Sequence, residues 1–367
     1  MTEKQLSLRA LNRSSLARQM LLERVSLPVT KALEKTVGIQ AQQAPAPYVW
    51  FWTRLKDFQR DDLAQAIEAH EIVKATFFRA TLHLTTREDY LRFRTAITPA
   101  LTGAAESIVK GRENTGFDQA EILEMGRKFI AQEPRSFAEI TAYFSETLPQ
   151  FDIGALRYSV RTHLHLIQVP TDTYWSYPGN PKFTLAETWN GEASSPKDET
   201  KALIKRILAA FGPASLNDLQ KWTSLMLKDI LPTFKDELVI YHDEKKKELF
   251  DIADMPLVDE DTPVPIRFLP GFDNLLIAYD KRQRIVADDY RKKVYLPGLI
   301  IAPTILIDGF VEGVWKAERK KKEAFLHMEL FKPLTQSQQS QLEEEAEALI
   351  RFLEPEATRY HLQVSEA

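Results

Sequence analysis

Cysteine is absent from this sequence of 367 residues. Its absence excludes disulfide bonds, thiolate metal sites and cysteine nucleophiles. Long apolar runs are missing as well, since none approaches the ~20 residues that a helix needs to cross a bilayer. The N-terminus is polar and charged, unlike a secretory signal. Together, these absences predict a cytoplasmic protein with no membrane partner.

The common signatures of nucleotide binding and ester hydrolysis are also missing. The sequence contains neither a glycine-rich phosphate loop nor a G-x-S-x-G nucleophile motif. His163 and His165 lie two residues apart, but no acidic residue stands beside them at the spacing of metal ligands. We therefore expect structural roles for both histidines, and neither a metal ion nor an organic cofactor.

Basic residues are slightly outnumbered by acidic ones overall, but they are locally concentrated. The formal net charge is −4, which argues weakly against a nucleic-acid partner. Basic residues nevertheless gather at 281–284, 291–293 and 319–322. Such runs are usually solvated surface, and the alternative is a basic face on a mildly acidic protein.

What the sequence does contain is a repeated order of elements. Helices are predicted at 11–24 (with Ser14 as its N-cap), at 29–38 and at 61–70. Residues 72–86 are rich in β-branched and aromatic residues, which predicts a pair of strands. Three helices followed by two strands is the order of a winged helix-turn-helix.

The same order recurs twice further along the chain, as in a degenerate tandem repeat. Residues 103–116 carry three glycines and are predicted as a linker. The later units are predicted from helices at 118–132, 136–146, 153–163, 199–211, 215–223 and 226–234, and from strands within 164–186 and 237–252. Ser136 and Glu139 form a capping-box pattern, Ser215 is a predicted N-cap, and residues 178–181 are predicted as a hairpin turn.

From about residue 265 the sequence changes to short apolar runs at 265–269, 274–279, 299–307 and 309–315, separated by Asp, Gly and Pro, typical of a mostly β module. Asp308 and Gly309 are predicted as a hairpin turn, followed by a helix at 335–353 and a last strand within 354–366. The predicted fold class is α+β, with three tandem winged helix-turn-helix units at 1–102, 103–197 and 198–264, and a β-rich module with a C-terminal helix at 265–367.

A short polar motif lies between the second predicted helix and a dense aromatic run. Gln40 and Gln42 flank one small residue, and the aromatic run at 48–52 follows after two prolines, which stop the preceding helix. A buried aromatic stretch would hold this turn rigidly and aim the two amides. The alternative is a pair of surface residues at a frayed helix end, because so short a pattern often arises by chance.

Two further stretches are candidates for contact with an anion. Arg79, Thr81 and His83 alternate along the first predicted wing strand, so they share one face, either solvated or aimed at a phosphate. The basic residues after 280 and the hairpin at 308–315 could form a wedge or phosphate clamp, or a structural turn with solvated lysines.

The chain resembles the AlkZ/YcaQ-like family of winged-helix DNA glycosylases, bacterial enzymes that remove alkylated purines or unhook crosslinks. The resemblance rests on five motifs in order, which span nearly the whole chain: GIQAQQAPAPY, FFRATLHLTTREDY, AAFGPASLNDLQKW, LPGFDNLLIAYDKRQRI and ILIDGFVEGVW. It implies three tandem winged-helix units and a β-rich module, curved around a DNA channel.

The catalytic signature of that family is Gln-Φ-Gln or Gln-Φ-Asp, where Φ is small or apolar. It falls here on Gln40, Ala41 and Gln42, so the resemblance implies that the two glutamines are catalytic. An amide cannot take a proton at neutral pH, but it can position water and stabilise an oxocarbenium-like state. The implied activity is that of a monofunctional glycosylase that excises N7-alkylated purines or unhooks crosslinks made of them.

The resemblance also implies a DNA-contacting surface and a partner, double-stranded DNA with alkylated bases. A monomer is expected, associated with the nucleoid when bound to DNA. Two other classes stay open: a non-catalytic winged-helix DNA-binding protein (a regulator or resistance protein), and a structural protein that never meets DNA. The residues predicted to contact DNA are Arg79, Thr81, His83, Lys281, Arg282, Arg284, Arg291, Lys292 and Trp315.

Overall fold

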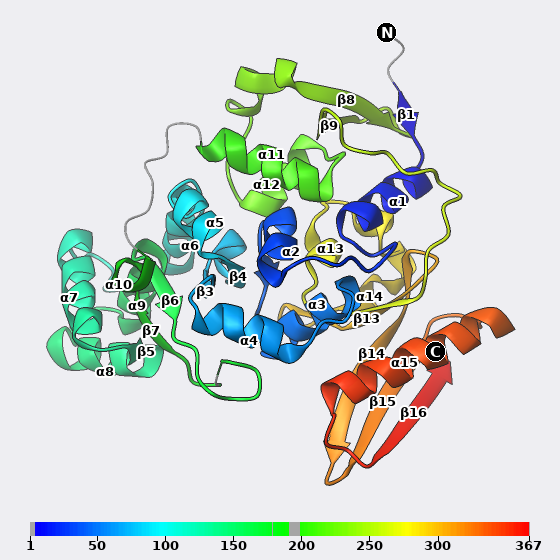
Figure 1. The fold of residues 1–367 in the computed structure, drawn as a ribbon. Helices are drawn as coiled ribbons and strands as arrows, with labels where there is room; N and C mark the ends of the chain where they lie inside the picture. The colour runs from blue at the N-terminus through cyan, green and yellow to red at the C-terminus, as the bar shows by residue number, and fades with distance from the viewer. Residues whose placement is uncertain (1–3, 178, 191–198, 367) are drawn as a thin grey trace.

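A computed structural model describes residues 4–177, 179–190 and 199–366 as a mixed α+β fold (Figure 1). The predicted helices at 29–38 and 61–70 are confirmed. In chain order the first elements are Gln5–Leu6 (β1), Leu8–Arg18 (α1), Val29–Thr36 (α2), Ile39–Gln40 (β2), Ala46–Arg54 (α3), Arg60–Glu68 (α4), Ile72–Thr76 (β3), Leu82–Thr86 (β4), Arg87–Phe93 (α5) and Thr98–Val109 (α6).

Two predictions in this part of the chain were wrong. Helix α1 begins earlier than predicted, because Ser7 is its N-cap and accepts a hydrogen bond from the Ala10 amide at 3.0 Å. Ser14 lies inside α1 and donates its hydroxyl to the Ala10 carbonyl at 2.9 Å. Part of the predicted linker at 103–116 belongs to α6, since buried Leu101 and Ala105 hold that helix against the core.

Helices followed by strands recur in the second part of the chain. Ser136 and Glu139 form the predicted capping box at the start of its second helix. The predicted hairpin turn includes Pro178, which lies outside the described residues. The elements are Gln119–Gln132 (α7), Arg135–Ser136 (β5), Phe137–Thr147 (α8), Ile153–His163 (α9), Leu166–Gln168 (β6), Lys182–Leu185 (β7) and Ala186–Asn190 (α10).

The third part repeats the pattern with one difference. The helix predicted at 226–234 is replaced by a 3-10 helix, because Pro232 lacks an amide donor and disfavours the α conformation at the preceding residue. Ser215 caps the preceding helix as predicted. The elements are Glu199–Phe211 (α11), Leu216–Thr223 (α12), Leu231–Glu237 (η2), Leu238–Asp243 (β8) and Glu248–Ile252 (β9).

The strands of the first two parts form one continuous sheet. Its six strands follow the order β2-β4-β3-β6-β7-β5, and the two hairpins meet where Ala75 pairs with Ile167. The third hairpin instead pairs with the N-terminus, through the parallel strands β1 and β8. The first two parts are therefore joined by backbone hydrogen bonds, whereas the third part is tied to the start of the chain.

The C-terminal part is built on a five-stranded sheet in the order β10-β13-β14-β15-β16, with α15 along one face (Figure 1). The apolar run at 274–279, expected from the sequence to belong to the mostly β module, instead begins with a short helix, because Asp273 caps it there. The elements are Arg267–Leu269 (β10), Asn274–Ile277 (α13), Arg291–Val294 (α14), Tyr295–Leu296 (β11), Ile300–Ile301 (β12), Thr304–Ile307 (β13), Phe310–Lys320 (β14), Glu323–Leu330 (β15), Gln336–Leu353 (α15) and Arg359–Glu366 (β16).

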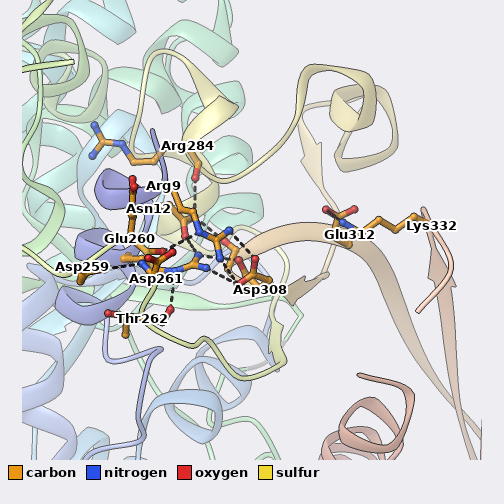
Figure 2. Close-up of polar contacts among 12 residues, drawn as sticks. Arg9, Asn12, Asp259, Glu260, Asp261, Thr262, Arg284, Asp308, Glu312 and Lys332 are labelled. Atoms are coloured by element: carbon orange, nitrogen blue, oxygen red, sulfur yellow. Dashed lines mark hydrogen bonds and ion pairs between the residues drawn. The ribbon is translucent and has the colours of Figure 1, made fainter. Parts of the chain in front are cut away.

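Helix α1 is fixed to the C-terminal part by polar contacts (Figure 2). Arg9 donates to the Asp308 carboxylate at 2.7 Å. Asn12 donates to the carbonyl oxygens of Arg284 and Gly309, each at 2.8 Å. Asp308 and Gly309 also form the predicted turn between β13 and β14. The hairpin turn therefore doubles as the anchor of the first helix.

Two buried ion pairs tie early segments of the chain to late ones. Arg18 and Asp251 are each 1% exposed and lie 2.7 Å apart. Arg54 and Asp273 are each 0% exposed and lie 3.0 Å apart. Buried pairs of this kind leave a costly unpaired charge when one partner is removed. Within the described part of the chain, none of the helices combines the length and apolarity needed to cross a bilayer.

Candidate functional site

The glutamine motif begins directly after helix α2. Gly38 has a φ of +84°, and a Cβ there would lie 2.8 Å from the Leu84 carbonyl oxygen, so the position requires glycine. The chain then enters β2, where Gln40 pairs with His83 of β4. The Gln40 residue is 8% exposed, whereas Gln42 is open to solvent. One amide of the motif is thus embedded in the fold and the other lies at the surface.

Asn274 fixes the backbone on both sides of this turn. Its Oδ1 accepts from the Gln40 amide at 3.1 Å, and its Nδ2 donates to the Gly38 carbonyl at 2.9 Å. Asp273 holds Asn274 in turn, because its carboxylate caps α13 and pairs with Arg54. Sequence reasoning missed both residues, although an Asp-Asn pair before an apolar run is a signal for a helix start.

The side chain of Gln40 is held by Arg79. The Arg79 Nη2 donates to the Gln40 Oε1 at 3.0 Å, and its Cζ lies 4.3 Å from the centre of the Trp222 ring. Burial, and then the charge of Arg282, lower the pKa of Arg79 to about 9. Arg79 therefore remains protonated at neutral pH.

Arg79, Thr81 and His83 do not share the face of one strand, so that geometric prediction was wrong. Arg79 lies in a 3-10 turn, Phe78–Ala80 (η1), with a φ of 54°, and β4 begins only at Leu82. Ala80 also has a positive φ, of 53°. Two consecutive left-handed residues reverse the chain, which brings Arg79 to Gln40. Thr81 closes the turn by donating its hydroxyl to the Phe78 carbonyl at 3.1 Å.

His83 is fully buried beside its strand partner Gln40. Its Nδ1 lies 3.1 Å from the Thr81 carbonyl, which can only accept, so Nδ1 carries the proton and Nε2 is an acceptor. Within the described ranges this Nε2 has no hydrogen-bond partner. Burial, and then the charge of Arg79, lower the pKa of His83 to about 3. The ring is therefore neutral, and it does not supply a charge for a phosphate.

We expect the buried ring of His83 to make the protein less stable in mild acid. Between pH 6.5 and about 3 the unfolded chain binds a proton that the folded chain does not, so stability falls as the pH falls. The slope of this contribution is at most ~1.4 kcal/mol per pH unit. Urea unfolding of the wild type and of His83→Asn at pH 7, 6 and 5 should give free-energy curves that converge toward acid. Parallel curves would contradict the assignment.

Four basic residues predicted to contact DNA lie within residues 281–292. Lys281 and Arg282 stand at the start of the 3-10 turn Arg282–Arg284 (η3), and Arg291 and Lys292 belong to α14. Lys281, Arg291 and Lys292 are exposed, as a phosphate contact requires. Arg282 is partly buried, with its Cζ 5.5 Å from the centre of the Tyr295 ring.

The other two residues of that prediction face inward. Arg284 donates to the Pro213 carbonyl at 2.9 Å, and the Trp315 Nε1 donates to the Leu269 carbonyl at 2.9 Å. Both side chains are buried, with their donors used to hold neighbouring segments together. Their placement suits a structural role rather than a contact with DNA.

A short hairpin with an apolar tip directly follows α14. Strands β11 and β12 pair across a tight turn, and Leu299 at its tip is 92% exposed. Leu296 and Ile300, on either side, are also exposed large hydrophobic residues. Sequence reasoning missed this hairpin, although proline and glycine between apolar residues are a signal for such a turn.

A groove of about 930 Å³ lies between this hairpin and the glutamine motif. Gln43, Gly271 and Leu296 are among the residues that line the groove. A Cβ at Gly271 would meet the Gln43 Oε1 at 2.9 Å and the Ile301 carbonyl at 3.0 Å. Among the residues that the structure describes, no group of three or more His, Asp or Glu side chains is placed to hold a metal ion.

Comparison with known proteins identifies the class. The model of the family described as "DNA glycosylase AlkZ-like" matches residues 33–352, so the chain belongs to the AlkZ-like DNA glycosylase family, as the sequence motifs indicated. A curated relative, an interstrand DNA cross-link repair glycosylase of Streptomyces sahachiroi, is 28% identical over 144 residues. That alignment covers 37% of this chain and 38% of the relative.

A solved structure extends the likeness to the whole fold. The DNA glycosylase AlkZ of Streptomyces sahachiroi matches with a TM-score of 0.80, at 20% identity, over 98% of this chain and all of that one. The mixed α+β architecture is therefore shared from end to end.

Proposed function

We propose that this protein is a monofunctional DNA glycosylase that excises N7-alkylated purines or unhooks interstrand crosslinks made of them. The observation that carries the proposal is the immobilised Gln40. Its backbone is held by Asn274 and its side-chain oxygen by Arg79, in a chain of a DNA glycosylase family. A surface glutamine at a frayed helix end would need none of these contacts.

Removal of an N7-alkylated purine requires orientation of water and electrostatic stabilisation rather than a general acid or base. A purine alkylated at N7 is already cationic and leaves as a neutral molecule, so its departure needs little protonation. The sugar passes through an oxocarbenium-like state, as in glycoside hydrolysis. The Gln40 Oε1 has a second lone pair beside the one that Arg79 occupies, and Gln42, which is exposed, follows two residues later. In this proposal the two amides position the attacking water and stabilise the cationic sugar.

In this proposal the scaffold binds duplex DNA that carries the lesion. The three successive sets of helices and strands act as winged-helix units around a DNA channel. The exposed Lys281, Arg291 and Lys292 contact backbone phosphates, which steers the duplex to the site. Thr81 and His83 shape the turn that presents Arg79, rather than contacting DNA themselves.

We expect the tip of the β11–β12 hairpin to assist excision from duplex DNA. An apolar side chain can enter between base steps and offset part of the cost of unstacking. Leu299→Ser should slow base release from a methylated duplex by about tenfold, with a much smaller effect on a methylated single strand. Met226→Ser, at another exposed apolar residue, is the matched control. Equal slowing on both substrates would contradict this role.

The test of the proposed function is release of free 7-methylguanine from methylated duplex DNA, measured by chromatography of the released bases. A duplex crosslinked by a nitrogen mustard, assayed on a denaturing gel, tests unhooking. Release from either substrate supports the proposal. If neither substrate reacts while duplex DNA is still bound, the protein is a non-catalytic DNA-binding protein.

A further inference from the structure

The groove beside the glutamine motif has no role in the chemistry proposed above. Gln43, which directly follows Gln42 in the chain, lines it together with the hairpin residues Leu296 and Ile300. Its volume of about 930 Å³ falls within the range of sites that enclose one small ligand, roughly 300–1,000 Å³. The groove therefore has room for a few nucleotides of one DNA strand, but not for a duplex.

Part of the lining is the solvent-exposed face of the C-terminal sheet. Lys316 of β14 lies opposite His327 of β15, which lies opposite Gln363 of β16, and all three line the groove. Residues directly opposite one another project from the same face of a sheet. Helix α15 packs on the other face, against Ala324 and Leu326. The row that lines the groove is thus open to solvent, with Lys316 and Gln363 exposed.

The charges along the groove favour a phosphate backbone. The acidic residues that line it in the described structure are already paired, Glu329 with Lys293 at 3.3 Å and Glu354 with Arg319 at 3.2 Å. Lys316 adds an exposed positive charge, without an ion-pair partner among the described residues. The charge that remains is therefore positive, and it attracts an anionic chain.

An aromatic ring and the apolar hairpin supply surfaces for bases. Trp175 lines the groove and is partly exposed, and its ring centre lies 5.0 Å from that of Tyr48 and 4.6 Å from that of Tyr174. Proteins bind single-stranded nucleic acid through basic grooves with aromatic side chains, because every base has a face on which to stack. Bases within an intact duplex stack on one another instead, so this lining suits unpaired nucleotides.

We propose that the groove binds a short unpaired stretch of one DNA strand, at the point where the tip of the β11–β12 hairpin opens the duplex. This assignment rests on the proposed function, in which the hairpin enters between base steps. Because Gln43 lines the groove and is the neighbour of Gln42, the unpaired stretch lies beside the two amides. Binding of that stretch offsets part of the cost of unstacking while the damaged base is released.

Equilibrium binding to undamaged DNA tests the proposal without requiring catalysis. A fully paired, fluorescently labelled duplex is compared with the same duplex carrying a short central bubble of mismatched pairs. The wild type should bind the bubble duplex about tenfold more tightly, the contribution expected from one base stacked on an aromatic side chain. Equal affinities for the two duplexes would overturn the proposal.

Charge substitutions show whether the groove causes this preference. Lys316→Glu should remove most of it, and Gln363→Glu, in the same row of the sheet, should weaken it as well. Lys320→Glu is the matched control, because Lys320 is an exposed lysine on the same face of β14 and is not among the residues that line the groove. Preference that persists in both groove variants, or that is lost equally in Lys320→Glu, would overturn the proposal.

Photocrosslinking determines where the unpaired strand lies. A 5-iodouracil placed within the bubble reacts on irradiation with a neighbouring aromatic side chain. Its crosslink should map to Trp175 or His327, the aromatic side chains of the lining that are partly exposed. Crosslinks found only at residues outside the groove would overturn the proposal.

The groove and the glycosylase function fail in different ways in these experiments. If no base is released from a methylated or crosslinked duplex, but the preference for the bubble persists and depends on Lys316, the groove assignment stands and the glycosylase function does not. If bases are released but the bubble duplex binds no more tightly than the paired one, the groove assignment is wrong and the glycosylase function stands.

Discussion

Gln40→Ala should lower the rate of 7-methylguanine release by about 10²- to 10³-fold, the loss typical when a single stabilising hydrogen-bonding group is removed from an active site. Gln40→Ala/Gln42→Ala should abolish measurable release. In the proposed mechanism neither amide can serve as an acid or base, so each would act through its position and its dipole alone. Single-turnover kinetics on methylated duplex DNA measures the effect free of product release.

Two controls separate the loss of catalysis from a general loss of an amide and from a loss of DNA binding. Gln65→Ala removes an exposed glutamine amide from α4 and should keep the wild-type rate. Duplex affinity of the double variant should stay within a few-fold of the wild type, because Gln42 is at the surface and Gln40 touches protein groups. A folded double variant that still releases the base at the wild-type rate would remove both residues from the mechanism.

Asp273→Ala should destabilise the protein by about 3–5 kcal/mol, the usual cost of leaving a buried charge without its partner. Arg54 would remain in the core with its charge unpaired, and α13 would lose its cap. Because α13 begins with Asn274, the turn that holds Gln40 should loosen as well. Urea-induced unfolding measures the loss of stability, and base release below the unfolding transition measures the loosening.

The size of this effect is checked against two other substitutions. Glu356→Ala breaks an exposed ion pair with Arg319, which should cost less than ~1 kcal/mol. Arg54→Met/Asp273→Leu removes both buried charges and should be less destabilising than Asp273→Ala alone. If Asp273→Ala costs no more than Glu356→Ala, the buried pair does not stabilise the fold.

Local patterns predicted those parts of the fold that short-range physics determines. The predicted N-caps Ser136 and Ser215 are confirmed, since the hydrogen bond of an N-cap is made within one helical turn. The same reasoning failed at Ser14, because an earlier serine competed for the role. The apolar run after Asp273 was misassigned because burial alone does not distinguish a short helix from a strand.

The candidate site was predictable in its residue types but not in its arrangement. Gln40 was identified from a motif, whereas its bonds to Asn274 and Arg79 join segments far apart in the chain. Arg79 was placed on a strand, because two consecutive left-handed residues without glycine are not expected from sequence. Contacts between segments far apart in the chain produce no periodic pattern in the local sequence, so they are not predicted from it.

The anchoring of α1 has a consequence for synthesis on the ribosome. The partners of Arg9 and Asn12 lie at Asp308, Gly309 and the Arg284 carbonyl, close to the other end of the chain. Helix α1 therefore stays without these hydrogen-bond partners until Asp308 and Gly309 have been synthesised. Contacts of such high sequence separation form slowly and leave apolar surface exposed in the meantime. Nascent chains truncated before residue 300 should thus need chaperone protection that the finished protein does not.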